Sequence, residues 1–527
     1  MALIQSALAY LLFVLRCCLT EWTMLFSVQR LHLETSLMTN RYSSPLSPLR
    51  SPLQSPPQSP LQRFQLAVGS LFICTLIVAL NGCSNAVESQ QTLIENVNVV
   101  DPVNGLTQNQ QVLIEDGVIA AVADASQTLT LNASAERFDA QNRYLIPGLW
   151  DMHVHFVYDP TLTNEMADLF LDYGVTSVRD TGGDIEQLAQ LRDALPSPKP
   201  NIYISGPLLD GKFVVYDGSD PDRPPLGTGV AESSAADATV AALKEAGADF
   251  IKIYELIQPE TYAALVAAAR QRDMPIASHV PLMMTADSAG PLADSMEHLR
   301  NIELACASNW RELLAQRQER INNFTEGLGY TLRAGLHSDQ RVPAIKSYDE
   351  KRCNQVLDTL SSTIQVPTLR LNTVTHLKPF EREDWPAALA ALPESTQLAW
   401  RARIDGLQQL PAVDPTFSQW SVFLIERLLA RGVPIGAGTD TPIGLGIPGY
   451  SLHAELEFLV QGGMTPQQAL YAATITPAEF FNMASTSGRV TQGMRADLVL
   501  LQDNPLADIR HSRSVEAVML AGKWVRK

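Results

Sequence analysis

Strand-like and helix-like segments alternate through the middle of the 527-residue chain. Short runs rich in β-branched and aromatic residues are separated by longer stretches of helical character. Eight strands are expected, over residues 149–155, 176–179, 201–205, 250–254, 276–279, 295–298, 366–371 and 435–439. Eight strands that alternate with helices predict an α/β fold, a (β/α)8 TIM barrel, whose chemistry lies at the carboxyl ends of the strands.

The two ends of the folded part follow a different pattern, because both are rich in strands. Residues 92–100 and 112–123 are predicted strands, and a Glu-Asp-Gly turn at 115–117 suits a hairpin. They are expected to pair with residues 498–501 and 515–525 in a small β-sandwich. The predicted organisation is therefore a β-sandwich made from residues 83–145 and 486–527, around a barrel over residues 146–485.

Two segments interrupt the barrel pattern. Residues 303–348 follow the sixth predicted strand, and residues 372–417 follow the seventh; the first of these is polar and helical in character. Additions after barrel strands commonly cover the active site and set its specificity. We therefore expect both segments near the site.

The first 82 residues differ from the rest. Ser-Pro-Leu repeats before residue 61 predict a disordered leader. An apolar run from Phe64 to Leu80 ends on Leu-Asn-Gly-Cys, which resembles a bacterial lipoprotein signal in which Cys83 becomes the lipidated first residue. A single uncleaved membrane anchor is the alternative. Both predict a protein of the bacterial cell envelope that is held at the membrane and faces the periplasm, with the outer membrane favoured by analogy.

Charge and cysteine content narrow the picture further. The net charge is −17 and no basic stripe is present, which disfavours nucleic acid as a partner. Only Cys306 and Cys353 lie in the folded part. In an oxidising compartment they could pair, but the sequence does not show whether they come close.

Five short segments at the ends of predicted strands carry metal-binding side chains. In a strand, successive side chains alternate faces, so His153 and His155 point the same way and can hold one ion together. Each segment alone has an ordinary explanation, such as a solvated histidine pair, an edge-strand lysine or a turn. Together, and in order, they predict a metal site. The segments are 151–155, 250–254, 278–280, 296–298 and 438–440.

The order of these residues resembles the amidohydrolase superfamily, in particular its imidazolonepropionase-like and prolidase-like branch, from about Gln91 to the end of the chain. Leu-Ile-Pro-Gly-Leu-Trp-Asp-Met-His before the site and Arg-Ala-Asp-Leu-Val-Leu-Leu after it are typical of the family. The resemblance implies two divalent metal ions with ligands from six residues. They are His153, His155, Lys252, His279, His298 and Asp440.

Lys252 favours the binuclear, prolidase-like branch. An ammonium has no lone pair to donate, and burial favours its loss of a proton. The resemblance implies a carboxylated Lys252 that bridges both ions, with His153, His155 and Asp440 at the first ion and His279 and His298 at the second. The imidazole-rich set favours zinc.

The resemblance further implies hydrolysis of a C–N bond in a small amide, peptide-like or cyclic amide substrate, by a hydroxide held between the ions. Asp440 would carry the proton to the leaving nitrogen. Tyr254 is a candidate donor to the oxyanion, with packing as the alternative. Four further residues are candidates for substrate binding, each with a structural role as the alternative. They are Arg179, Arg300, Arg370 and His453.

Two other functions stay open. The same metals would serve a lactonase or a phosphotriesterase, because they activate water against any electrophilic centre. A surface lipoprotein without catalytic activity would retain the fold alone.

Overall fold

The structure is a computed structural model that describes residues 89–220, 223–409 and 413–527. The predicted leader and Cys83 lie outside the described residues. In the part of the chain that is described, no helix combines the length and the apolar character that crossing a membrane requires.

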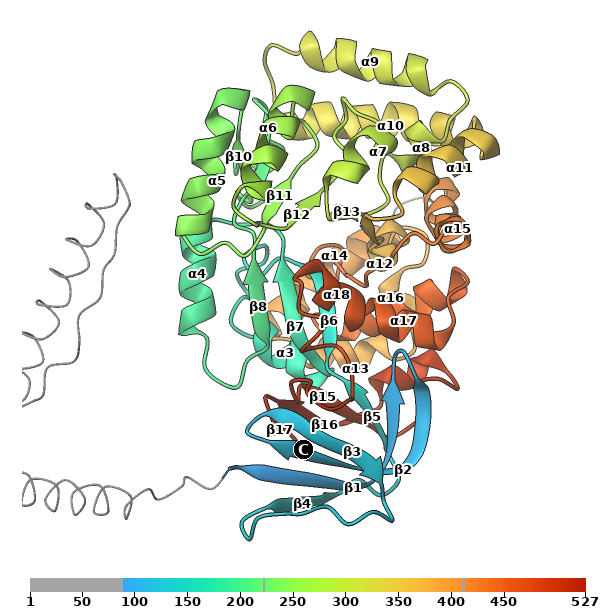
Figure 1. Cartoon of the computed structure of the whole chain (residues 1–527). Helices are drawn as coiled ribbons and strands as arrows, with labels where there is room; N and C mark the ends of the chain where they lie inside the picture. Colours follow the sequence, from blue (N-terminus) through green and yellow to red (C-terminus); the bar gives the residue numbers. More distant parts are fainter. Residues whose placement is uncertain (1–88, 221–222, 410–412) are drawn as a thin grey trace, which may run out of the picture. The chain divides into compact units, whose positions relative to one another are not determined.

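Both ends of the described chain meet in one mixed sheet of eight strands (Figure 1). β1 and β2 form a hairpin-like pair, and β2 turns into β3 through Asp116 and Gly117, both in the left-handed region. β5 pairs with β1 on one side and with β15 on the other, which joins the N-terminal and C-terminal strands. The predicted assembly of the sandwich region from both chain ends is confirmed. Its strands are β1 (Gln91–Asp101), β2 (Gly105–Glu115), β3 (Val118–Asp124), β4 (Glu136–Asp139), β5 (Tyr144–Pro147), β15 (Leu498–Leu501), β16 (Val515–Leu520) and β17 (Lys523–Arg526).

The middle of the chain forms the predicted barrel of parallel strands. β6, β7 and β8 pair in order, and β9, β11, β12, β13 and β14 pair in order in a second sheet. The strands are short and buried on both faces, which is the pattern expected where helices cover a parallel sheet. Their bounds are β6 (Leu149–Val154), β7 (Val175–Asp180), β8 (Asn201–Ile204), β9 (Leu208–Asp210), β10 (Gly227–Gly229), β11 (Ile251–Ile253), β12 (Ile276–Ser278), β13 (Ser295–Glu297) and β14 (Ile364–Val366).

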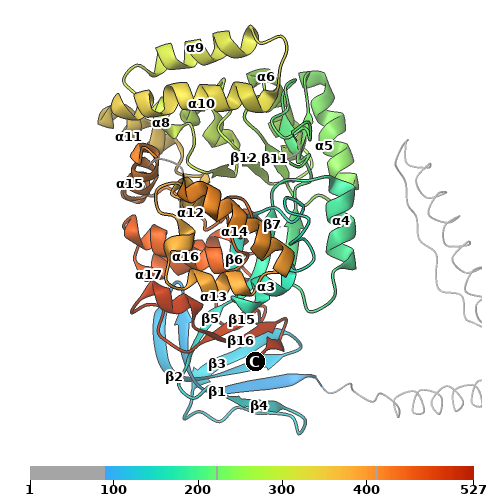
Figure 2. The same ribbon diagram turned by 180° about the vertical axis from the view of Figure 1, so that it is seen from behind.

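Helices surround the barrel strands and pack apolar faces on them (Figures 1 and 2). Local signals fix several helix ends; α17, for example, begins with a capping box between Thr465 and Gln468 and with Pro466 in its first turn. The helices outside the segment after β13 are α3 (Met166–Asp172), α4 (Ile185–Ala194), α5 (Ala236–Glu245), α6 (Pro259–Arg270), α7 (Ala286–Ala289), α12 (Leu369–Asn372), α13 (Trp385–Ala390), α14 (Glu394–Gln408), α15 (Thr416–Ala430), α16 (Tyr450–Gln461), α17 (Pro466–Ala472) and α18 (Ile475–Phe480).

The last two predicted barrel strands differ from the structure. β14 ends at Val366, and the residues that follow it form α12, because Glu455 accepts hydrogen bonds from the N–H groups of Leu369 and Arg370 and so caps a helix there. Residues 435–439 do not form a ladder. The barrel closes there through single parallel bridges, Gln365 to Ile435 and Val154 to Thr441.

A helical segment follows β13, where the sequence predicted an insertion. It contains α8 (Ile302–Ala305), α9 (Trp310–Asn322), α10 (Gly329–Lys346) and α11 (Glu350–Thr359). Cys306 and Cys353 are joined by a disulfide with a Cα–Cα distance of 4.2 Å, which closes residues 306–353 into a loop. We call these residues the disulfide-closed segment. Both views show α9 and α10 side by side at the end of the barrel region opposite the sheet of β1 to β3 (Figures 1 and 2).

Candidate metal centre

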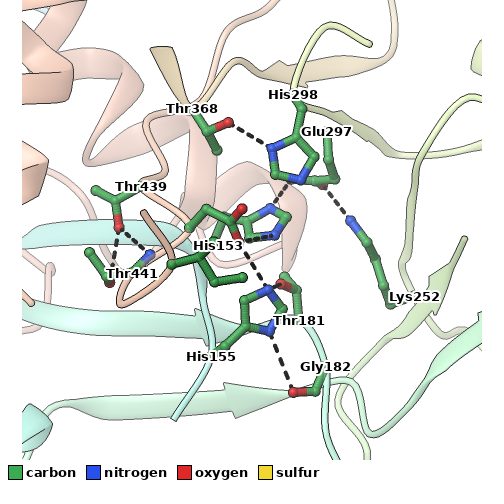
Figure 3. A network of polar contacts seen from close by, with 12 residues as sticks. His153, His155, Thr181, Gly182, Lys252, Glu297, His298, Thr368, Thr439 and Thr441 are labelled. Atoms are coloured by element: carbon green, nitrogen blue, oxygen red, sulfur yellow. Dashed lines mark hydrogen bonds and ion pairs between the residues drawn. The ribbon is translucent and has the colours of Figure 1, made fainter. Parts of the chain in front are cut away.

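Three predicted ligands meet at the end of β6. Asp440 Oδ1 lies 3.3 Å from His153 Nε2 and 3.0 Å from His155 Nε2. The ligand atoms of the three residues lie within 4.8 Å of one another, and all three side chains are buried. Figure 3 shows both histidines reaching the same point from one strand. This spacing suits a single metal ion.

Two further predicted ligands adjoin this group. The ring centroid of His298 lies 4.6 Å from that of His153 and 4.7 Å from that of His279. His279 follows β12 directly and His298 follows β13 directly, so the four histidines converge from the carboxyl ends of three barrel strands, as the barrel predicts.

All four histidines have the same hydrogen-bonding arrangement. In each, Nδ1 faces a carboxylate, hydroxyl or carbonyl oxygen, and we assign the proton to this nitrogen. Nε2 then keeps its lone pair for a metal. The Nδ1 partners are Glu297 Oε2 for His153 at 2.7 Å, Gly182 O for His155 at 3.4 Å, Glu255 Oε1 for His279 at 2.7 Å and Thr368 Oγ1 for His298 at 2.7 Å. This donor set fits divalent metal ions.

Lys252 points into the same cluster from β11 (Figure 3). Its side chain is fully buried, and Nζ has no hydrogen-bond partner among the described residues. Glu297 Oε1 lies 3.9 Å away. Burial lowers the pKa of Lys252 to about 7, with a further contribution from Arg179 against the opposing effect of Glu297. A substantial share of the amine is therefore neutral near pH 7, which is the form that can be carboxylated or can bind a metal.

The backbone is strained where these side chains converge. His298, Asp440 and Thr368 adopt positive φ angles of 66°, 62° and 46°. Such conformations cost on the order of 1 kcal/mol for residues other than glycine and persist only where the surroundings enforce them. They are concentrated at functional sites.

Glu297 is held by residues of the barrel strands. Arg179 Nη2 donates to Glu297 Oε1 at 2.7 Å and Ser295 Oγ donates to the same atom at 2.8 Å. Burial by itself would raise the pKa of Glu297, but Arg179 and Lys252 outweigh it and hold that pKa below its usual range. We call Glu297 with Arg179 and Ser295 the barrel clamp. It keeps a carboxylate against His153.

Glu255 is held by residues of α10. Arg333 donates to both of its oxygens, at 3.0 and 3.1 Å, and His337 Nε2 lies 2.5 Å from Oε2. Burial alone would raise the pKa of Glu255, but Arg333 and His337 hold it well below its usual range. We call Glu255 with Arg333 and His337 the α10 clamp. It keeps a carboxylate against His279.

The remaining predicted site residues fall into two groups, and the first lies at the metal centre. The ring of Tyr254 is buried with its centroid 4.4 Å from that of His279. Arg300 follows His298 by two residues, and its charge lowers the pKa of His298, second only to burial. Its Nε is buried without a hydrogen-bond partner among the described residues. Tyr254 and Arg300 therefore both lie beside histidines of the candidate centre.

The second group makes hydrogen bonds with other parts of the protein, although Nη1 of Arg370 has no hydrogen-bond partner among the described residues. Arg179 is fully buried and donates to Met152 O as well as to the barrel clamp. Arg370 Nη2 donates to the carbonyls of Ile443 and Gly444. His453 pairs with Ser512 Oγ and with the carbonyl of Tyr173. These contacts favour the structural alternative for all three residues over direct substrate binding.

Five residues that orient the histidines were not predicted from the sequence. They are Glu255, Glu297, Thr368, Arg333 and His337. Glu297 could have been found, because it shares the face of its strand with Ser295 and directly precedes His298. Arg333 and His337 lie four residues apart on one helix face, which is a weak signal without knowledge of what they meet.

Comparison with known proteins agrees with this geometry. The model of the amidohydrolase family matches residues 420–525. Ochratoxinase from Aspergillus niger is 38% identical over 95 residues, which cover 18% of this chain and 19% of that enzyme. The chain thus matches about a fifth of the length of this relative.

Solved structures extend the likeness of the fold to most of the chain. A Xaa-Pro dipeptidase with methionine bound in its active site has a TM-score of 0.59 at 20% identity, over 83% of this chain and 100% of that one. A putative prolidase from Bifidobacterium longum has a TM-score of 0.57 at 21% identity, over 84% of this chain and 95% of that one. The chain is therefore similar to the amidohydrolase family over residues 420–525, and over most of its length it shares the fold of the Xaa-Pro dipeptidase and the putative prolidase.

Proposed function

We propose that this protein is a binuclear metal-dependent amidohydrolase that cleaves the C–N bond of a small amide or peptide-like substrate bearing a carboxylate. One observation carries the proposal: four buried histidines turn Nδ1 to protein oxygens, and the Nε2 atoms of His153 and His155 lie at Asp440. A buried lysine amine nearby has no hydrogen-bond partner in the described part of the chain. The imidazole-rich set favours zinc, and His153, His155, Asp440, His279, His298 and a carboxylated Lys252 would hold two ions.

Divalent ions at this place would activate water and polarise the scissile carbonyl. The protein supplies the proton transfer. Burial alone would raise the pKa of Asp440, but His153 and His298 hold it well below its usual range, so the residue is a carboxylate at neutral pH. It can therefore take a proton from the nucleophile and return it to the leaving nitrogen. Tyr254 would donate to the developing oxyanion, since burial keeps its hydroxyl protonated by raising its pKa well above the usual value.

The substrate class is supported by Arg300 and by the relatives. A guanidinium beside the histidines with a buried, unpartnered Nε suits a carboxylate, which it can bind through two hydrogen bonds. One of the neighbouring structures holds methionine, and a further prolidase structure, at 20% identity, is described in complex with N-methylphosphonate-L-proline. Both ligands carry a carboxylate next to nitrogen.

Metal analysis and substrate profiling test the proposal together. The purified protein should contain about two divalent ions, and Lys252→Ala should hold fewer, with partial recovery of activity when short carboxylic acids are added. A panel of dipeptides, N-acyl amino acids, lactones and phosphotriesters should show turnover of the C–N substrates foremost. Turnover of lactones or phosphotriesters alone would favour those activities instead, and metal without turnover on any of them would favour the non-catalytic lipoprotein.

Asp440→Asn tests the proton transfer separately. The variant should fold and keep much of its metal, yet lose on the order of 100- to 10,000-fold in turnover, the usual effect of removing a general acid or base. The loss should be largest for amides with poor leaving groups, because these depend most on protonation of nitrogen. Wild-type turnover of such amides by a metal-replete Asp440→Asn protein would exclude the assignment.

We also propose that the protein is exported and anchored at the bacterial envelope through Cys83. The apolar run that ends on this cysteine supports the proposal. The disulfide between Cys306 and Cys353 agrees with an oxidising compartment. Mass spectrometry of the mature N-terminus should find lipid on Cys83, and Cys83→Ser should release the protein from membranes. An unmodified N-terminal residue at another position would contradict this.

A further inference from the structure

One face of α10 is turned toward the metal centre. Leu332 and Leu336, one helical turn apart, are buried in an apolar cluster that also contains Tyr254. Arg333 and His337 are the next residues along the helix and repeat the same spacing. Burial of the leucines therefore brings both polar side chains onto Glu255.

Three side chains bind the carboxylate of Glu255, and two of them come from α10. Arg333 contacts both oxygens, and His337 contacts Oε2. The third is His279, whose Nδ1 lies 2.7 Å from Oε1. Since Glu255 is fully buried, water does not compete for its oxygens. Through the carboxylate of Glu255, the orientation of His279 thus depends on α10, which lies about 80 residues beyond Glu255 in the sequence.

α10 is itself held at its first residue and near its middle. Its first residue, Gly329, lies so close to the barrel that a Cβ there would be 2.5 Å from the carbonyl oxygen of Val214. Its neighbour α9 is tied to it by Arg317, which donates to Gln340 at 2.6 Å. The disulfide then closes the whole segment. These contacts keep Arg333 and His337 where Glu255 needs them.

We propose that Arg333 and His337 are positioning residues of the metal centre, through which the disulfide-closed segment sets the affinity of the metal position that contains His279. The inference rests on the proposed function, because it requires His279 to bind an ion. A partner that accepts the Nδ1 proton fixes the ring and raises the basicity of Nε2, and loss of such a partner typically weakens metal binding by about 10- to 100-fold. Arg333 and His337 act on His279 only through Glu255.

Arg333→Met tests the proposal in the full-length, disulfide-intact protein. Apo protein is titrated with Co²⁺ and Zn²⁺ against a chelating indicator, and the visible spectrum of Co²⁺ reports the ligand field at each position. One of the two ions should bind about 10- to 100-fold more weakly while the other keeps its wild-type affinity. Arg333→Lys, which keeps the charge but loses the paired hydrogen bonds, should recover part of the loss.

Arg320→Met is the matched control. Arg320 lies in the same segment and pairs with Asp339 at 2.6 Å, but both side chains face solvent, at 44% and 60% exposure. An exposed pair of this kind contributes little, so both affinities should stay at the wild-type values.

The outcomes separate the two proposals. Two ions with unchanged affinities in Arg333→Met would overturn the inference and leave the proposed function standing. Equal weakening of both ions would also overturn it, because that would indicate general loosening. A single ion in the wild-type protein would overturn the binuclear site and the inference with it. If Arg333→Met does not fold, His337→Gln carries the same test, and unchanged affinities there count against the inference.

Discussion

His153 and His279 are oriented by the same chemistry in two different regions of the molecule. Each donates Nδ1–H to a buried glutamate at 2.7 Å, and each glutamate is held by an arginine. In the barrel clamp, Arg179, Ser295 and Glu297 all come from strands at the centre of the fold. In the α10 clamp, Arg333 and His337 come from an added helical segment.

The two clamps differ in which part of the fold must move before the histidine can change its orientation. Arg179 is fully buried between the rings of Phe250 and Phe480, so the barrel clamp cannot loosen unless the barrel does. Arg333 keeps 11% of its side chain exposed and lies on a helix outside the barrel strands. Segments of that kind open locally at lower free-energy cost than a core sheet. In the proposed binuclear site, one metal position would therefore be built into the fold, and the other would depend on an addition to it.

The largest effect should come from breaking the barrel clamp. Arg179→Met keeps the apolar contacts to Phe250 and Phe480 but leaves Glu297 as a buried charge without its arginine. The free energy of unfolding should fall by about 3–5 kcal/mol, the usual result of removing one partner of a buried pair. Urea unfolding of the metal-free protein measures this.

Replacing both partners provides the control for the barrel clamp. Arg179→Met combined with Glu297→Leu should recover much of the stability, because no buried charge remains unpaired. Arg333→Met should cost less than Arg179→Met, since the α10 clamp retains His337 and lies nearer to solvent. A loss below about 1 kcal/mol for Arg179→Met would remove the proposed contrast between the clamps.

The next largest effect should come from Lys252, which lies between the two clamps, and it concerns the pH dependence of stability. Its pKa is lowered to about 7 in the folded protein, below the value of about 10.4 in an unfolded chain. Between these pH values the unfolded chain binds more protons, so the free energy of unfolding should rise with pH by up to about 1.4 kcal/mol per pH unit. Below pH 7 the group contributes no slope.

Comparison with Lys252→Met isolates that contribution. Stability of both metal-free proteins is measured from pH 6 to 10, and the difference between them should grow in favour of the wild type above about pH 7. Parallel curves would show that the lysine keeps its proton in the folded state, which would also count against carboxylation.

Gly329→Ala should weaken metal binding at the position that contains His279, although it changes none of the proposed ligands. In an open helix this change would stabilise by about 1 kcal/mol, because alanine favours helix. Here the new Cβ would lie 2.5 Å from the carbonyl oxygen of Val214, so the first turn of α10 must move, and Arg333 follows one turn later. We expect a loss of about tenfold in the affinity of that ion, by analogy with loss of an outer partner.

Gly335→Ala in the same helix is the matched control. Its Cβ would meet only the far end of the Arg320 side chain, which can move aside. Metal affinity should stay unchanged and the helix should gain stability. Equal behaviour of Gly329→Ala and Gly335→Ala in a metal titration would argue against tight seating of α10.

The smallest effect on metal binding should follow from opening the disulfide. Replacing both Cys306 and Cys353 by serine frees a loop of 47 residues and should lower the free energy of unfolding by about 2–4 kcal/mol, mostly through the unfolded state. Arg333 and His337 still reach Glu255 in the folded protein. The affinity for the ion at the position that contains His279 should therefore fall only a few-fold. A complete loss of that ion would mean that the disulfide, rather than the packing of α10, positions the segment.

The sequence by itself predicted the convergence of the candidate ligands, the barrel and the composite sheet. His153 and His155 share a strand face because alternation is a local property. The order of the remaining ligands along alternating strands and helices is enough to bring them to one end of a barrel. The strands at both chain ends likewise carry their own pattern, so their pairing was predictable.

Only the tertiary structure decided how those ligands are held. The contacts of His337 and Arg333 with Glu255 span 82 and 78 residues, and nothing local marks them. α12 replaced a predicted strand because Glu455, 86 residues away from Leu369, caps it. Local patterns set which face of an element is buried, whereas the partner of a buried charge depends on where the rest of the chain packs. That is why the metal ligands were visible in the sequence and the residues that orient them were not.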